Sequence, residues 1–148
     1  MTLKNTENDA IISIKNLQSA EDMQEETELI TEGRFYESGD KLYIFYTEED
    51  TEDMPGSTVM IVVTGDDVTI SRKGDFGAKM HYSAGEREQV IYHTPFGDMH
   101  MMLETLQVDN HLSADGGTLK LLYRLSVNGD IIHNNLTITV KNGKGEHK

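Results

Sequence analysis

The sequence predicts an all-β protein, an antiparallel, meandering β-barrel of about 8–10 strands. Runs of β-branched and aromatic residues recur along the chain, which is typical of strands. Short links rich in Gly, Asp and Asn separate them, and such links favour hairpins between neighbours. No segment has ten residues of helical periodicity, which excludes folds built on parallel strands with helical crossovers. A closed barrel is favoured over a sandwich because closure removes exposed sheet edges.

The first half of the chain contains five strand signals. They span residues 10–14, 28–37, 41–48, 57–64 and 68–74. The links "SGD" (38–40) and "GDD" (65–67) predict hairpins. The segment "LQSAEDMQEE" (17–26) has a helix-capping residue in Ser19, but it lacks an apolar face. We therefore expect a loop there.

The second half continues the pattern with shorter strands and then longer ones. Strands are expected at 78–82, at 89–94, from 98 onward, at 119–127 and at 131–140, and "NGD" (128–130) predicts a tight hairpin. In "YHTPFGDMHMMLETLQV" (92–108), alternation places Met101, Leu103 and Thr105 on one face. The apolar set then changes face to Leu106 and Val108. That change predicts a β-bulge near Glu104 or Thr105.

The composition indicates one domain, residues 1–148, that holds together by packing alone. A chain of 148 residues can bury a substantial core, and the first and last few residues are expected to be flexible. There is no cysteine, which excludes disulfides, thiolate metal sites and cysteine nucleophiles. The sequence has neither a secretory signal pattern nor a run of about 20 apolar residues. We expect a soluble, cytoplasmic protein.

The charge argues against two classes of partner. The formal net charge is -13, and residues 1–60 alone carry 15 Asp and Glu against 4 Lys and Arg. Because nucleic-acid affinity comes mainly from Lys and Arg at phosphates, neither nucleic acid nor an anionic membrane is expected to bind. A solubilising acidic surface explains the charge, and an acidic docking face for a protein is the alternative.

Several short strings resemble a known family. They are "EGRFY", "LYIFY", "SRKG", "YHTPFG", "LKLLYRL" and "HNNLTITV", in that order from residue 32 to 140. Together they resemble the YwiB-like family of uncharacterised bacterial proteins. The resemblance implies a calycin-like, or lipocalin-like, β-barrel in a small cytosolic protein, and it implies no activity and no catalytic residues. Calycin barrels often hold small ligands, which is an analogy between folds.

The motifs for metals and catalysis are weak. His93 and His100 stand near three methionines, but two imidazoles without a carboxylate at fixed spacing do not predict a metal site. The acidic stretch "EEDTEDMPG" (48–56) lacks the spacing of a calcium loop and is expected to be a solvated connector. No serine, histidine and carboxylate arrangement follows from spacing. We predict a protein that is not an enzyme and has no cofactor.

Three inward residues are candidates for ligand binding: Arg72, Thr105 and Tyr123. Arg72 shares a face with Val68 and Ile70, so it points toward the interior near the end of its strand. Three alternatives fit it: a carboxylate or carbonyl partner that closes the barrel mouth, an anchor for an anionic ligand, or an outward side chain. Tyr123 lies on an apolar face, so its hydroxyl needs a hydrogen-bond partner.

Two functions follow from these observations. In the first, the barrel is non-enzymatic and binds a small, partly apolar or anionic ligand inside. In the second, a filled barrel acts as a protein-interaction module through its acidic surface or an exposed strand. Large inward residues such as Met101, Leu121 and Tyr123 favour filling, although a barrel of this size can do either. The sequence does not identify a protein partner, and a monomer and a homodimer both fit.

Overall fold

The computed structural model describes residues 10–50, 52 and 55–142, and these residues form ten strands and no helix. The strands are β1 (Ala10–Ala20), β2 (Met23–Ser38), β3 (Lys41–Glu48), β4 (Ser57–Thr64), β5 (Asp67–Arg72), β6 (Met80–Tyr82), β7 (Arg87–Thr94), β8 (Gly97–Ser113), β9 (Gly116–Val127) and β10 (Asp130–Asn142). The expected flexible ends, and positions 51, 53 and 54 of the acidic connector, lie outside the described residues.

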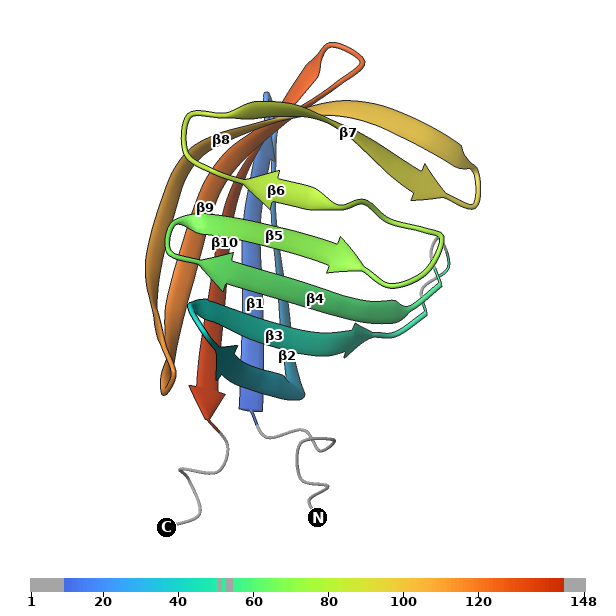
Figure 1. Ribbon diagram of the computed structural model, residues 1–148. Coiled ribbons are helices and arrows are strands. Elements are labelled where there is room, and N and C mark those ends of the chain that lie inside the picture. The colour runs from blue at the N-terminus through green and yellow to red at the C-terminus, as the bar shows by residue number, and fades with distance from the viewer. Residues whose placement is uncertain (1–9, 51, 53–54, 143–148) are drawn as a thin grey trace.

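All ten strands belong to one antiparallel sheet that curls into a nearly closed barrel (Figure 1). The order is β6-β5-β4-β3-β2-β1-β10-β9-β8-β7, so neighbours in the chain pair, and β1 pairs with β10. The predicted all-β meander is therefore confirmed. Among the described residues, no helix is long and apolar enough to cross a membrane.

The barrel wall has two layers that cross at a steep angle. In Figure 1, β1, β8, β9 and β10 run up the back, and β3 to β6 run across the front. Strand β2 belongs to both layers, because it pairs with β1 up to Gly33 and with β3 from Arg34 onward. Gly33 is the corner: a Cβ there would collide with the Phe45 carbonyl and the Ile12 side chain. Only glycine lets these strands approach so closely.

The expected loop at 17–26 is wrong. Residues 17–20 continue β1, and β2 begins at Met23 after a two-residue turn in which Glu21 has a positive φ of 42°. The first ten residues of β2, up to Glu32, are exposed apart from Thr31, so their side chains show no alternation of buried and exposed positions. Backbone pairing with β1 holds this segment as a strand. Because backbone pairing does not require alternating apolar residues, the sequence contains no pattern that predicts it.

The predicted β-bulge is confirmed. The register of β8 against β9 shifts between Thr105 and Gln107, so Leu106 is the extra residue. The bulge lets Thr105 and Val108 both face the interior, whereas Leu106 is 45% exposed. Of the two residues expected to carry the apolar set after the bulge, Val108 packs on the core and Leu106 does not, because the inserted residue itself leaves the alternation.

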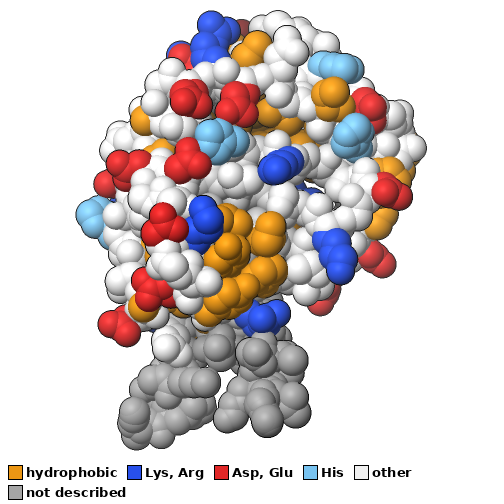
Figure 2. Space-filling model, in the orientation of Figure 1, with side chains coloured by type: hydrophobic (Ala, Val, Ile, Leu, Met, Phe, Trp, Pro, Cys, Tyr) orange, Lys and Arg blue, Asp and Glu red, His pale blue; other side chains and the backbone are white. Residues whose placement is uncertain are grey.

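The interior is filled by side chains from all ten strands. Fully buried members include Ile12, Ile44, Ile61, Val68, Leu103, Leu119, Leu121 and Ile138. The rings of Tyr82 and Tyr123 pack edge to face at 4.8 Å between centroids, which joins the front layer to the back layer. On the outer face of β2 and β3, the rings of Tyr36, Tyr43 and Phe45 stack, and Figure 2 shows a hydrophobic patch on the front surface among charged side chains.

The seam of the barrel lies between β6 and β7, the two ends of the sheet order. Among the described residues, one backbone bridge crosses it, between Gly77 and His93. The connector between β6 and β7 is fixed to β8 because Gly85 donates to the Thr105 carbonyl and Thr105 donates to the Glu86 carbonyl. The seam therefore has fewer backbone hydrogen bonds than the ladders beside it.

Candidate functional site

Four inward polar side chains form a row across the back wall. Gln18 of β1 lies opposite Asn134 of β10, Asn134 lies opposite Tyr123 of β9, and Tyr123 lies opposite Thr105 of β8. Thr105 is 1% exposed and Asn134 is 3% exposed. Of the three predicted site residues, the structure thus brings Thr105 and Tyr123 together as direct cross-strand neighbours.

An amide cluster lies at one end of this row. The Asn134 Oδ1 accepts hydrogen bonds from Gln18 Nε2 at 2.9 Å and from Asn16 Nδ2 at 3.2 Å. Asn134 Nδ2 donates to the Ile132 carbonyl at 3.3 Å. The Asn16 Oδ1 is buried and has no hydrogen-bond partner among the residues that the structure describes. A buried acceptor without a partner lowers the stability of the folded state by about 1–3 kcal/mol. A hydrogen-bond donor from a ligand or a water would remove this cost.

A groove of about 700 Å³ opens above the amide cluster, between the β1–β2 and β9–β10 hairpins. Gln18 lines it and also belongs to the cluster, so the two are continuous. The carboxylates at the groove are Glu21, Asp22, Glu25 and Asp130, and the larger apolar side chains are Met23, Ile131 and Ile132. Met23 is 67% exposed. The groove therefore joins negative charge to an apolar surface.

Arg72 is held by Glu48 of β3. Its Nε and one terminal nitrogen donate to the two Glu48 oxygens at 2.9 and 2.8 Å, with the side chains 25% and 31% exposed. Burial opposes the charge, yet the bonds and charge of Glu48 raise the pKa of Arg72 above its ordinary value. Gly77 lies against the Arg72 side chain. Of the three alternatives for Arg72, the structure has the carboxylate partner.

An inward tyrosine of β6, Tyr82, packs against the polar row. The Tyr82 hydroxyl donates to Met80 Sδ at 3.2 Å, and the Tyr82 ring packs edge to face on the ring of Tyr123. Burial raises the pKa of Tyr82 well above its ordinary value, and the neighbouring Tyr123 adds to the effect. Burial likewise raises the pKa of Tyr123 and of Tyr46. These hydroxyls are therefore neutral near pH 7 and act as hydrogen-bonding groups.

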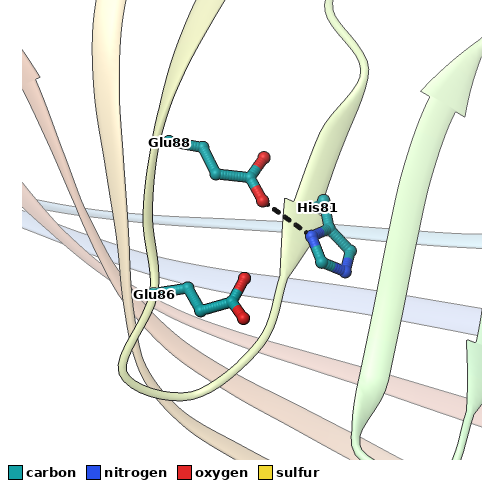
Figure 3. Close-up of side chains that lie close together, drawn as sticks. All are labelled: His81, Glu86 and Glu88. Atoms are coloured by element: carbon teal, nitrogen blue, oxygen red, sulfur yellow. Dashed lines mark hydrogen bonds and ion pairs between the residues drawn. The ribbon is translucent and has the colours of Figure 1, made fainter.

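A second cluster lies at the seam, and the sequence interpretation missed it (Figure 3). His81 of β6 contacts Glu88 Oε2 of β7 through Nδ1 at 2.7 Å and Asp67 Oδ1 of β5 through Nε2 at 2.6 Å. A nitrogen of His81 and one carboxylate oxygen each of Glu86 and Glu88 lie within 4.8 Å of one another. In the part of the chain that the structure describes, no other three His, Asp or Glu residues meet this geometry. The signal in the sequence was the "HYSAGERE" stretch (81–88), which places a histidine and two glutamates around a turn.

His93 and His100, the two histidines near the methionines, lie outside this cluster. His93 Nδ1 is hydrogen-bonded to Asp98 across the β7–β8 ladder at 2.8 Å. His100 lies opposite Ile91 in the same ladder. His93 is therefore a surface histidine with one carboxylate neighbour, and it is a useful control for the seam cluster.

Comparisons with known proteins agree with this fold. The model of the domain of unknown function DUF1934 matches residues 12–138. An uncharacterised β-barrel protein, YwiB of Bacillus subtilis (strain 168), is 24% identical over 133 residues, which are 89% of this chain and 92% of that protein. The crystal structure of the ywiB protein from Bacillus subtilis superposes with a TM-score of 0.82, at 22% identity and over 92% of each chain. Because the family model covers most of the length, the chain belongs to the DUF1934 family, as its resemblance to YwiB-like proteins predicted.

Proposed function

We propose that this chain is a non-enzymatic binding protein of the cytoplasm that holds a small, partly apolar amine at the groove end of its barrel. The observation that carries the proposal is Asn16 Oδ1, a buried acceptor without a protein partner. Asn16 lies two residues below Gln18 on the inner face of β1, and Gln18 lines the groove. An N–H group of a ligand satisfies this acceptor directly or through a water.

The charges around the groove favour a cation over an anion. Glu25 and Asp130 are exposed carboxylates that line the groove, each two residues along its strand from an apolar lining residue, Met23 in β2 and Ile132 in β10. A protonated amine with a short alkyl part matches both kinds of surface. The anionic alternative is less favoured, because Arg72 already has two hydrogen bonds to Glu48.

Binding without catalysis fits the chemistry of the row. The pKa values of Tyr82 and Tyr123 are raised by burial, so these hydroxyls orient a ligand and do not exchange protons near neutral pH. The amides of Gln18 and Asn134 are neutral hydrogen-bonding groups as well. The proposed role is therefore that of a carrier or a sensor.

Native mass spectrometry of the purified protein, compared with its denatured mass, is the first test. We expect a released amine, or else saturable binding of hexylamine in calorimetry that hexanol and hexanoate do not reproduce. The Glu25→Gln, Asp130→Asn double variant should bind hexylamine about tenfold more weakly at low salt, because two carboxylates near the cation are lost. Glu37→Gln, at the far end of β2, is the control. Stronger binding of hexanoate than of hexylamine contradicts the proposal.

A second candidate, an interaction module, is favoured by one observation. Over residues 23–33, β2 pairs with β1 alone among the described strands. Its other edge therefore has backbone N–H and C=O groups that are not paired with a neighbouring strand. A second copy of this chain is the matched partner, with two β2 edges paired around a two-fold axis. Glu25, Glu26 and Glu28 lie along that edge. Repulsion between them predicts dimers in sedimentation only at high salt and high concentration.

A further inference from the structure

We infer that His81, Glu86 and Glu88 form a site for a divalent transition-metal ion, with zinc as the best match, that joins the two edges of the barrel sheet. The three side chains come from three separate parts of the seam: His81 from β6, Glu86 from the connector and Glu88 from β7. Their ligand atoms lie within 4.8 Å of one another. Figure 3 shows both carboxylates directed toward the imidazole.

The donor set matches zinc in number and in kind. One imidazole nitrogen and two carboxylate oxygens are three of the four ligands of a tetrahedral ion, and water completes the set. Bonds of about 2.1 Å place such ligands about 3.4 Å apart, so small rotations of the glutamate side chains close the site. The nitrogen donor favours zinc over magnesium and calcium, which prefer oxygen ligands.

Asp67 is a hydrogen-bond partner for the second ring nitrogen of His81, as metal-binding histidines commonly have. It contacts His81 Nε2 at 2.6 Å, on the side of the ring opposite Glu88. A carboxylate there accepts the Nε2–H, which leaves Nδ1 free to bind a metal and fixes the ring orientation. When both nitrogens of His81 carry protons, the one on Nδ1 is shared with Glu88, and a metal ion at Nδ1 takes the place of that proton.

The backbone holds the ligands in place before any ion binds. His81 lies opposite Thr69 in the β5–β6 ladder, and Glu88 lies opposite Leu103 in the β7–β8 ladder. The backbone N–H of Glu86 donates to the Ser83 carbonyl, and the Glu86 carbonyl accepts from the Thr105 N–H. These bonds fix the connector against β8. A preformed site loses little conformational entropy on binding.

The location explains what the ion does. The seam is crossed by one backbone bridge, between Gly77 and His93, where complete ladders join the other strands. An ion held by β6 and β7 together adds a link at this weak place. Zinc is therefore expected to raise the stability of the barrel and to slow opening of the seam.

The test uses the full chain, stripped with a chelator and titrated with zinc chloride alone in calorimetry. We expect one ion per chain, with magnesium and calcium on the order of 100-fold weaker. Glu86→Gln should weaken zinc binding at least about tenfold while the His81–Glu88 contact stays, and Asp67→Asn should weaken it about 10–100-fold. His93→Ala, which removes a surface histidine that also contacts one carboxylate, should leave binding unchanged.

Hydrogen exchange separates a seam site from stray binding elsewhere on the surface. Zinc should slow exchange of the Gly77 and His93 amides, and this protection should be absent in Glu86→Gln. Circular dichroism of the variants checks that each is folded. Absence of saturable 1:1 zinc binding by the wild-type chain, or binding that Glu86→Gln leaves intact, overturns the inference.

Discussion

Arg72 of β5 and Glu48 of β3 are joined by two parallel hydrogen bonds that reach across β4. Both side chains are less than one-third exposed, so removal of either leaves a charge that water solvates only in part. We predict that Arg72→Ala lowers the free energy of unfolding by about 1–3 kcal/mol in urea titrations. The same result is expected for Glu48→Ala.

The control for this pair is Arg124, which makes one bond of 2.8 Å to Glu104. Because that pair is more exposed, Arg124→Ala should cost about 0–1 kcal/mol. An equal decrease in the free energy of unfolding for Arg72→Ala and Arg124→Ala would contradict the larger contribution predicted for the Arg72–Glu48 pair.

Asn16 links stability to ligand binding. Asn16→Leu removes a buried acceptor that has no partner, and Asn134 keeps its bond to Gln18. The free energy of unfolding of the ligand-free protein should therefore change by less than about 1 kcal/mol or rise. Binding of hexylamine should be lost. Retained amine binding in calorimetry would separate Asn16 from the proposed ligand site.

Asn134→Leu should behave in the opposite way. It leaves the donors of Asn16 and Gln18 without their shared acceptor. We predict a loss of about 1–3 kcal/mol in urea titrations, because two partly buried donors lose their partner. A loss no larger than that of Asn16→Leu would show that the amide cluster is not buried in solution.

The corner at Gly33 does not accept a larger residue. A Cβ would meet the Phe45 carbonyl and the Ile12 side chain, and the backbone partner cannot move without breaking the β2–β3 ladder. Gly33→Ala should lower the free energy of unfolding by about 2–4 kcal/mol, measured by thermal or urea unfolding. Gly39→Asn is the control, since Gly39 faces open space at a φ of 66° that Asn tolerates.

The pH dependence of stability should carry a contribution from His81. Hydrogen bonds to Glu88 and then Asp67 raise the pKa of His81 above its ordinary 6.5 in the metal-free protein. The folded state thus holds the proton more tightly than the unfolded state, so the stabilisation is complete below about pH 6.5 and is lost as pH rises through the folded pKa. Urea titrations with chelator should show a decline of about 1 kcal/mol or less, absent in His81→Gln.

Local patterns were sufficient to predict most of the fold. Alternation in 119–127 placed Tyr123 inside, and the change of face after Leu103 predicted the bulge, since both depend only on the two-residue period of a strand. The β1–β2 hairpin was missed because its residues are polar on both faces. A strand that is held by its ladder alone has no hydrophobic signature.

The candidate site was predictable only in part. Thr105 and Tyr123 face inward as the alternation indicated, but their contact depends on the β8–β9 register after the bulge. The seam cluster depends on two features of the tertiary structure. The pairing of β5 with β6 brings Asp67 to His81, and the closure of the barrel brings Glu88 to the same imidazole. The stretch 81–88 places His81 and Glu88 on either side of a turn, but their contact and the β5–β6 pairing cannot be read from spacing along the chain.

The pairing of β1 with β10 affects the order in which the protein is made and folded. Ala10 lies opposite Asn142, so β1 leaves the ribosome well before β10 and must wait for it before the β1–β10 ladder is complete. During that interval β1 has one free edge, and its hairpin partner β2 carries Glu25, Glu26 and Glu28. Like charges on nascent chains keep such edges apart, so the acidic hairpin protects the barrel from aggregation until its C-terminal strand arrives.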